Sequence, residues 1–397
     1  MNTLRRVVLV TRALPHHSIG GMEAVAWDLA REFSRQSAAV TVLTAAIPGM
    51  PMHFEEAGVR IRALPDTSWE RYGAHWWRST LQAFEDSLLS ECDVVLSVSA
   101  GGFGLLPLQP RLPKVPFVLQ AHGTSIGEII SKWKSGSPRG IATSGRNVAW
   151  VAKDLAAYRK FDAIVAVGTR VAEDFQRWPI NRIVESSRLR LIPNGVDTRI
   201  FRPDPIARSR LRQKFGWTDD LHVVISVGRL HKQKGVDLGL DAIAMLAKDT
   251  SKVRYLVVGS GPEDHELRAK AARMNLGRLV QFTGAIDRKM VAEYLNAADA
   301  MLFATRRVEG NPLNVLEALS VGLPVIVSGH LKRTVPSSEH VTFVNQYDAA
   351  QVAIALQSAL SRKPLRSTLL PQGFSLSESA ESYLALFDEL IIQRHRA

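Results

Sequence analysis

Two glutamates eight residues apart, Glu309 and Glu317, enclose the segment of this sequence with the clearest chemical character. Between them stands Gly310-Asn311-Pro312-Leu313. Pro312 suits the first position of a helix, so we expect Glu309 in a loop and Glu317 about one and a half turns into the helix. The amides of Gly310 and Asn311, with the positive end of the helix dipole, would then bind a diphosphate. The alternative is an exposed acid followed by an ordinary helix face.

Two cations five residues apart, Arg229 and Lys234, follow the apolar run 223–227 and Gly228. A planar guanidinium and a compact ammonium suit a diphosphate whose negative charge grows as a sugar departs. The sequence contains no Asp-x-Asp pair, and its single cysteine, Cys92, cannot build a cysteine-rich metal site. We therefore expect these cations to replace a metal ion. A solvated basic loop is the alternative.

His122 follows the expected strand 116–120, in the segment Gln120-Ala121-His122-Gly123-Thr124. A histidine at a strand end is commonly a structural hydrogen-bonding residue. The carboxyl end of a parallel strand is, however, where open α/β sheets bind their ligands, so we place His122 in the candidate site. Gly259 and Gly261 also follow an apolar run, but no third glycine completes a dinucleotide fingerprint, which weakens a nicotinamide oxidoreductase as an interpretation.

Short apolar runs alternate with helix-length segments along almost the whole chain, a pattern typical of parallel sheets with crossover helices. The residues Met22, Val25, Ala26, Leu29 and Phe33 share one helix face behind the Gly20-Gly21 loop. The expected strands are 7–11, 39–44, 94–98, 116–120, 163–167, 190–192, 223–227, 254–258, 280–283, 300–303 and 325–327.

The chain has 397 residues, whereas a single domain typically has roughly 150, so we expect more than one domain. The likeliest linker is 193–197, with Pro203 and Pro205 soon after it. We therefore expect doubly wound domains at 1–196 and 197–375. A last helix within 376–397 carries an apolar stripe and could cross back to the N-terminal domain.

The formal net charge of +12 favours an anionic partner. Each half of the chain carries +6 and there is no basic tail, which indicates a general field rather than a nucleic-acid-binding arm. The run 7–10 is too short for a signal peptide, and the uncharged stretch 94–110 is too polar to span a membrane. We expect a cytoplasmic protein.

Aromatic and basic residues are interleaved in the first half of the chain. Such a mixture suits a membrane interface or a lipid-phosphate acceptor, and it also suits helix packing with solvated charges. The residues that we assign to this acceptor or membrane surface are Arg71, Trp76, Trp77, Arg78, Lys132 and Lys134.

Several motifs, in this order, resemble glycosyltransferase family 4. They are Gly20-Gly21, Ile192-Pro193-Asn194-Gly195-Val196-Asp197, Val227-Gly228-Arg229-Leu230, Val258-Gly259-Ser260-Gly261-Pro262-Glu263, Phe282-Thr283-Gly284 and the Glu-x7-Glu element. The resemblance implies the GT-B fold, in which two Rossmann-like domains face each other. It also implies a nucleotide-sugar donor on the C-terminal domain, an acceptor on the N-terminal domain and retention of anomeric configuration.

The same resemblance implies roles for single residues. Arg229 and Lys234 look like the diphosphate clamp, Glu317 like the acceptor of ribose hydroxyls and Glu309 like the acid at the transferred sugar. His122 resembles the histidine beside the reacting carbon. Here 310–313 reads Gly-Asn-Pro-Leu where many members have Gly-Phe-Gly-Leu. These residues line the hexose pocket in the family.

Taken with this resemblance, these observations predict a metal-independent hexosyltransferase that moves sugar from a nucleoside diphosphate to a hydroxyl of a glycan or lipid-linked acceptor, in cell-envelope polysaccharide or glycolipid synthesis. The resemblance implies that the transfer is retaining. Gly20 and Gly21 would cover the diphosphate. We expect no cofactor, peripheral contact with an anionic membrane and no nucleic-acid partner. The alternatives are a nucleotide-sugar epimerase or hydrolase on the same fold and, in another class, a basic nucleic-acid-binding protein, for which no motif is present.

Overall fold

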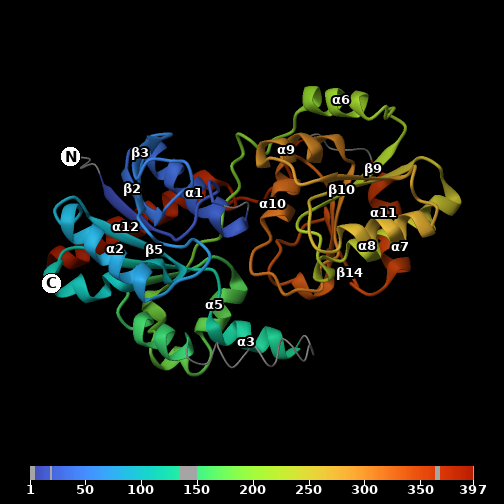
Figure 1. Cartoon of the computed structure of the whole chain (residues 1–397). Coiled ribbons are helices and arrows are strands. Elements are labelled where there is room, and N and C mark those ends of the chain that lie inside the picture. Colours follow the sequence, from blue (N-terminus) through green and yellow to red (C-terminus); the bar gives the residue numbers. More distant parts are fainter. Residues whose placement is uncertain (1–4, 18–19, 135–149, 363–366, 397) are drawn as a thin grey trace. The chain divides into compact units, whose positions relative to one another are not determined.

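The computed structural model describes residues 5–17, 20–134, 150–362 and 367–396, with the side chains of 131–134 excepted. The chain forms two compact units (Figure 1). The first consists of Met1–Gly195 and Leu376–Ala397, and the second of Val196–Ser375. The final helix, α12 (Leu376–Arg396), therefore belongs to the first unit.

An eight-stranded sheet forms the centre of the first unit, in the order β3-β4-β2-β1-β5-β6-β7-β8. Every pairing is parallel except that of β3 with β4, so β3 is an antiparallel edge strand. The central strands are predominantly apolar because both faces of the sheet are covered. The strands are β1 (Arg6–Val10), β2 (Ala39–Ala45), β3 (His53–Glu56), β4 (Val59–Leu64), β5 (Val94–Val98), β6 (Phe117–Ala121), β7 (Ala163–Ala166) and β8 (Leu189–Leu191).

Helices cover both faces of this sheet. One face packs against α1 (Gly21–Arg35) and α12, and the other against α2 (Ala74–Ser87), the 3-10 segment η1 (Ser99–Arg111) and α5 (Thr169–Phe175). The helix α3 (Ser125–Lys134) follows β6. The long helix α12 joins the unit because Tyr383 and Phe387 pack against Phe33 of α1, with ring centroids 5.9 and 5.6 Å from it.

The second unit contains a six-stranded parallel sheet in the order β11-β10-β9-β12-β13-β14. Numbered within the unit, this is the 3-2-1-4-5-6 order of a doubly wound nucleotide-binding fold. The strands are β9 (His222–Val227), β10 (Val253–Val258), β11 (Val280–Gly284), β12 (Ala300–Phe303), β13 (Val325–Ser328) and β14 (Val341–Val344).

Its helices again form two layers. One face packs against α9 (Arg288–Ala297) and α10 (Leu313–Ser320), and the other against α7 (Val236–Asp249), α8 (Asp264–Arg273) and α11 (Ala349–Leu360). The helix α6 (Pro205–Lys214) precedes β9, and its buried Arg208 donates to Asp299 Oδ1 at 2.6 Å. The two doubly wound sheets confirm the predicted α/β class.

The expected strands all occur, and each end lies within one residue of the predicted one, but β3, β4 and β14 were not predicted. They lie at or beside sheet edges, where Val59-Arg60-Ile61-Arg62 alternates apolar and charged residues instead of forming a continuous apolar run. None of the helices in the described ranges is long and apolar enough to pass through a bilayer.

Candidate functional site

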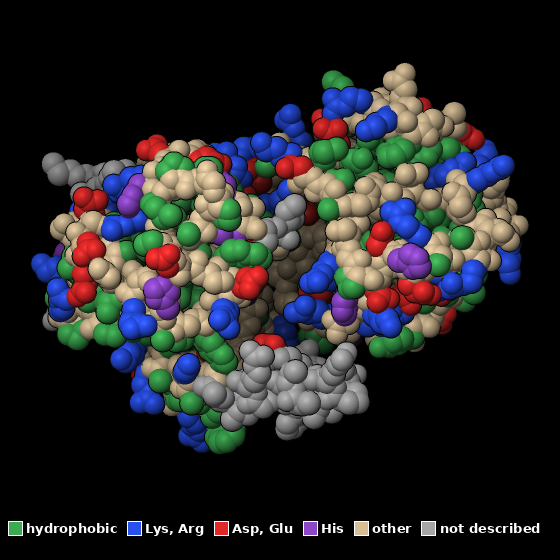
Figure 2. Space-filling model, viewed as in Figure 1, with side chains coloured by type: hydrophobic (Ala, Val, Ile, Leu, Met, Phe, Trp, Pro, Cys, Tyr) green, Lys and Arg blue, Asp and Glu red, His purple; other side chains and the backbone are tan. Residues whose placement is uncertain are grey.

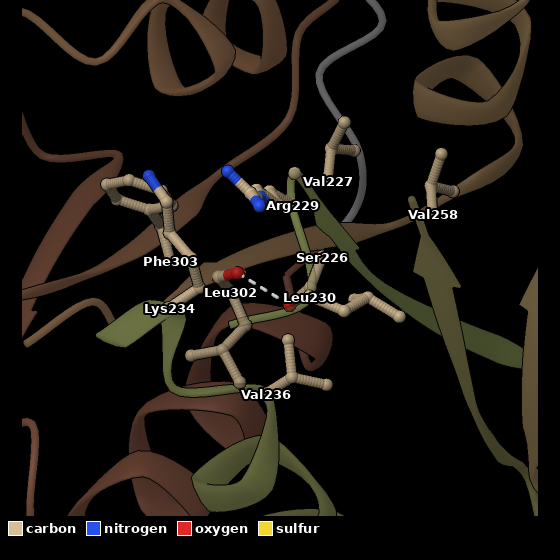
Figure 3. Close-up of a pocket in the computed structure, with 10 residues that line it drawn as sticks. Ser226, Val227, Arg229, Leu230, Lys234, Val236, Val258, Leu302 and Phe303 are labelled. Carbon is tan, nitrogen blue, oxygen red and sulfur yellow. Dashed lines mark hydrogen bonds between the residues drawn. The ribbon is translucent and has the colours of Figure 1, made fainter. Parts of the chain in front are cut away.

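The strand order of the second unit reverses between β9 and β12, and at such a switch point the loops diverge and leave a crevice beyond the carboxyl ends of the strands. A small recess lies there, partly open to solvent (Figure 3). The residues that line it are Ser226, Val227, Gly228, Arg229, Leu230, Lys234, Val236, Val258, Leu302 and Phe303.

The floor of this recess is held by buried hydrogen bonds between strands. Ser226 Oγ of β9 donates to the carbonyl of Leu302 in β12 at 2.7 Å and lies 2.8 Å from the Tyr255 hydroxyl of β10. Gly259, at φ 134°, follows β10, and a Cβ there would lie 1.9 Å from the carbonyl oxygen of Gly228. Close approach of the two strand ends therefore requires glycine.

Both predicted cations, Arg229 and Lys234, line the recess, and Figure 3 shows their side chains extending to the same side of it. Arg229 is exposed, and among the described residues its guanidinium makes no hydrogen bond or ion pair. Lys234 ends the 3-10 turn η4 (Lys232–Lys234), and its ammonium lies 5.5 Å from the centroid of the Phe303 ring. This pair can bind an anionic group that enters from solvent.

Lys234 is directed into the recess by a tight approach of the backbone behind it. Gly235 has φ 71°, and a Cβ there would lie 1.9 Å from the carbonyl oxygen of Ala304, directly after β12. Only glycine fits both the left-handed conformation and the contact. The turn thus connects the end of β9 to the end of β12 and fixes the base of the Lys234 side chain.

Glu309 lies in the loop after β12 and meets Lys234, whose Nζ donates to Glu309 Oε1 at 2.6 Å. The two side chains are 26% and 18% exposed, so the ion pair is only partly screened by water. The structure thus brings together two of the predicted site residues that are 75 positions apart in sequence. It places a carboxylate beside the proposed diphosphate clamp.

Glu317 lies in α10, which begins at Leu313 with Pro312 as its N-cap. The prediction that Pro312 is the first helical residue is therefore wrong by one position, because its ψ of 95° is extended. The Asn314 side chain donates to the carbonyl of Val227 at 2.8 Å and fastens the start of α10 to the end of β9. Gly310 and Asn311 form the turn that leads into the helix.

The Glu317 carboxylate is 7% exposed and accepts a hydrogen bond from Arg288 Nη2 at 3.0 Å. A carboxylate paired with a guanidinium keeps acceptor capacity for hydroxyl groups. Sequence reasoning missed Arg288 and Asn314. Neither stands in a distinctive motif, and their roles depend on how α9, α10 and β9 pack.

In the first unit His122 follows β6 and is partly buried. Burial lowers the pKa of its imidazole to about 4, so the ring is neutral near pH 7. Its Nε2 lies 3.1 Å from Gln120 Oε1. Gly20 is the N-cap of α1 and Gly21 its first residue, and their contact with a diphosphate stays a prediction.

The expected acceptor or membrane surface needs correction. Trp76 is 2% exposed and its indole donates to the carbonyl of Gly101 at 2.9 Å, so it is a core residue. Trp77 is partly buried and donates to the carbonyl of Ala100 at 3.1 Å. Both indoles satisfy their N–H groups internally because they face η1, which leaves Arg71 and Arg78 as the exposed members of the set. The side chains of Lys132 and Lys134 lie outside the described part of the chain.

On the visible face outside the recess, basic and acidic side chains are intermixed (Figure 2). Figure 2 shows Lys and Arg side chains scattered among acidic ones on the visible face of each unit. Within the described ranges, no three or more His, Cys, Asp or Glu side chains are grouped so that they could hold a metal ion.

Two protein-family models match the chain. The model described as "Glycosyltransferase Family 4" matches residues 19–200, and that described as "Glycosyl transferases group 1" matches residues 207–373. A GDP-mannose-dependent alpha-(1-6)-phosphatidylinositol monomannoside mannosyltransferase of Mycolicibacterium smegmatis is 29% identical over 239 residues, which are 57% of this chain and 62% of that protein. The match thus spans less than two thirds of that relative.

A mannosylfructose-phosphate synthase of Agrobacterium fabrum is 23% identical over 398 residues, covering 94% of this chain and 85% of that protein. Among solved structures, the sucrose-phosphate synthase of Thermosynechococcus elongatus superposes with a TM-score of 0.75 at 21% identity, covering 98% of this chain and all of that one. The lipopolysaccharide glycosyltransferase WaaG gives 0.66 at 19% identity, covering 97% and 98%. These structural likenesses establish the fold.

Proposed function

The chain belongs to glycosyltransferase family 4 and has the GT-B fold, and from this premise we propose that it is a retaining, metal-independent hexosyltransferase. Its donor is a nucleoside diphosphate sugar, and its acceptor is a hydroxyl group of a sugar phosphate, a glycan or a lipid-linked sugar. The observation that carries the proposal is the recess at the β9/β12 switch point, which Arg229 and Lys234 line and where Lys234 pairs with Glu309.

The recess provides the charge that the reaction requires. When the bond between the anomeric carbon and the diphosphate oxygen breaks, negative charge develops on the leaving diphosphate. Arg229 and Lys234 stabilise this charge more strongly in the transition state than in the bound donor, and that difference lowers the barrier. The new bond joins the anomeric carbon to the acceptor oxygen, and the acceptor proton passes to the departing diphosphate.

Two carboxylates position the donor. Glu317, oriented by Arg288, accepts hydrogen bonds from the ribose hydroxyls, and Glu309 accepts them from the transferred sugar. The same Glu309 holds the Lys234 ammonium in the recess, so one loop couples sugar position to the cation on the leaving group. The nucleotide sugar is a substrate, and the reaction needs no further cofactor.

The chemical class of acceptor is supported by the relatives. One relative transfers mannose to a phosphatidylinositol monomannoside, and another synthesises a mannosylfructose phosphate. Both products carry phosphate, and the net charge of +12 favours such an anionic acceptor. We place the reaction in glycolipid or cell-envelope polysaccharide synthesis at the cytoplasmic side of a membrane, with peripheral contact through basic side chains such as Arg71 and Arg78.

The test is release of nucleoside diphosphate from a panel of UDP- and GDP-hexoses, with and without sugar-phosphate and glycolipid acceptors. Proton NMR of the product reports the anomeric configuration. Acceptor-dependent release with an α-linked product from an α-linked donor supports the proposal. Release at the same rate without acceptor would indicate a hydrolase instead, and an inverted product would contradict retention.

A further inference from the structure

Three polar side chains of the first unit form a buried hydrogen-bonded chain that ends at His122. Gln120 Nε2 donates to the hydroxyl of Tyr383 at 2.9 Å, and Gln120 Oε1 accepts from His122 Nε2 at 3.1 Å. Tyr383 belongs to α12, 263 residues away from Gln120 in sequence. The C-terminal helix is thereby connected to the candidate site histidine.

Gln120 and Tyr383, which precede His122 in this series of hydrogen bonds, are buried and fixed in position. Gln120 is 1% exposed and Tyr383 2% exposed, so neither exchanges its partner for water. The Tyr383 ring packs against Phe33 and Phe387, with centroids 5.9 and 6.0 Å away, which fixes the position of its hydroxyl. With its nitrogen at the Tyr383 hydroxyl, the Gln120 amide directs its oxygen toward His122.

The chemistry of the amide oxygen decides where the histidine proton lies. A carbonyl oxygen only accepts hydrogen bonds, so the facing Nε2 of His122 must carry a hydrogen. Because the ring is neutral near pH 7, Nδ1 then holds a lone pair. Nδ1 makes no hydrogen bond to any residue that the structure describes, which leaves it available to a ligand.

We propose that Gln120 and Tyr383 are positioning residues that hold His122 in its Nε2–H tautomer, so that Nδ1 accepts a hydrogen bond from a substrate hydroxyl. This inference rests on the proposed function for the identity of the substrate as a sugar. The tautomer itself is a property of the free protein. It can therefore be tested without any transfer reaction.

The direct test is long-range proton–nitrogen NMR of full-length protein labelled with ¹⁵N-histidine, in which the two ring nitrogens of each tautomer resonate far apart. His122→Gln identifies the signals of His122. At pH 7 we expect a single Nε2–H tautomer in the unmodified protein. An Nδ1–H tautomer, or an averaged mixture of the two, would overturn the proposal.

Two variants test the chain of contacts. Gln120→Met keeps the length of the side chain and removes both hydrogen bonds, and Tyr383→Phe removes only the hydroxyl. Each should turn the His122 signals into a tautomer mixture and lower kcat at least tenfold, with the donor KM within about twofold. The matched control is Tyr158→Phe, which removes another buried hydroxyl of the same unit, bonded to Asp154. It should leave the His122 tautomer unchanged.

A merely structural role would lower the melting temperature of the variants without moving the tautomer or kcat, and that result would overturn the proposal. If Gln120→Met does not fold, Tyr383→Phe and the spectrum of the unmodified protein decide. If His122 is fixed as the Nε2–H tautomer and yet no nucleotide sugar is consumed, the positioning role of Gln120 and Tyr383 is supported and the proposed function is wrong. The two claims are thus separable.

Discussion

Replacing Lys234 with alanine should lower kcat about 10²-fold and change the donor KM less. The ammonium lines the recess in which we propose that the diphosphate departs, and its interaction with the leaving group would strengthen as the bond breaks. Removal of Lys234 also leaves Glu309 without its cationic partner, which now stands 2.6 Å away. The unpaired carboxylate then repels the diphosphate and adds to the loss.

The expected loss of kcat can be estimated from the interaction of the Lys234 ammonium with the leaving diphosphate. Two unit charges about 4 Å apart interact by about 4 kcal/mol at an effective dielectric constant of about 20. This dielectric suits Lys234, whose side chain is 26% exposed, better than that of a dry interior. Water that fills the vacated space recovers part of the interaction, which leaves about 2.7 kcal/mol, equivalent to about 10²-fold in rate.

The assay is steady-state release of nucleoside diphosphate at saturating acceptor, with Lys232→Ala as matched control. Lys232 lies in the same 3-10 turn with its side chain exposed, so its removal should alter kcat less than twofold. The double variant Lys234→Ala with Glu309→Gln should bind donor more tightly than Lys234→Ala alone, because the repulsion is removed. A kcat for Lys234→Ala within twofold of the unmodified protein would refute the role assigned to this residue.

Three further outcomes are expected. Saturating EDTA should leave at least half of the transfer activity, since cations occupy the recess; complete loss that Mg²⁺ or Mn²⁺ restores would refute metal independence. Gly235→Ala should reduce the free energy of unfolding in urea by at least about 2 kcal/mol, because of its φ of 71° and the clash with Ala304; a change under about 0.5 kcal/mol would contradict this. Arg71→Glu with Arg78→Glu should weaken sedimentation with anionic vesicles, at about 1 kcal/mol per basic residue near the surface. If the unmodified protein does not sediment even at low salt, membrane contact is excluded.

Buried parallel strands were predictable because a strand covered on both faces is predominantly apolar, as 223–227 and 94–98 are with one serine each. The edge strands do not contain an apolar run of this kind. β3 reads His-Phe-Glu-Glu and has one long side free of partners, so its residues need not be apolar. The doubly wound class thus followed from the sequence, while the extent of each sheet did not.

Some features of the candidate site were also predictable from the sequence, and others were not. The spacing of Arg229 and Lys234 after an apolar run predicted that both side chains lie beyond a strand end, since the run fixes where the strand stops. The contacts of Glu309 with Lys234 and of Glu317 with Arg288 could not be predicted, because they depend on which strands and helices become neighbours.

The sequence itself contains an indication that Trp76 is buried. Trp76, Thr80, Ala83 and Phe84 are buried on one face of α2 at helical spacing, which indicates a core position rather than a membrane-facing one. Interleaved charges on the other faces of the same helix suggested an interfacial surface instead.

The central claim is that the recess beside Arg229 and Lys234 binds the diphosphate of a nucleotide sugar. The most direct measurement is the thermal stability of the full chain, in EDTA, across nucleoside diphosphates and nucleotide sugars. A ligand at about 100 times its Kd adds about 2.7 kcal/mol to stability, so at least one nucleoside diphosphate should raise the melting temperature clearly. The shift should vanish in the double variant Arg229→Ala with Lys234→Ala. No shift with any nucleotide, or an equal shift in the double variant, would contradict the claim.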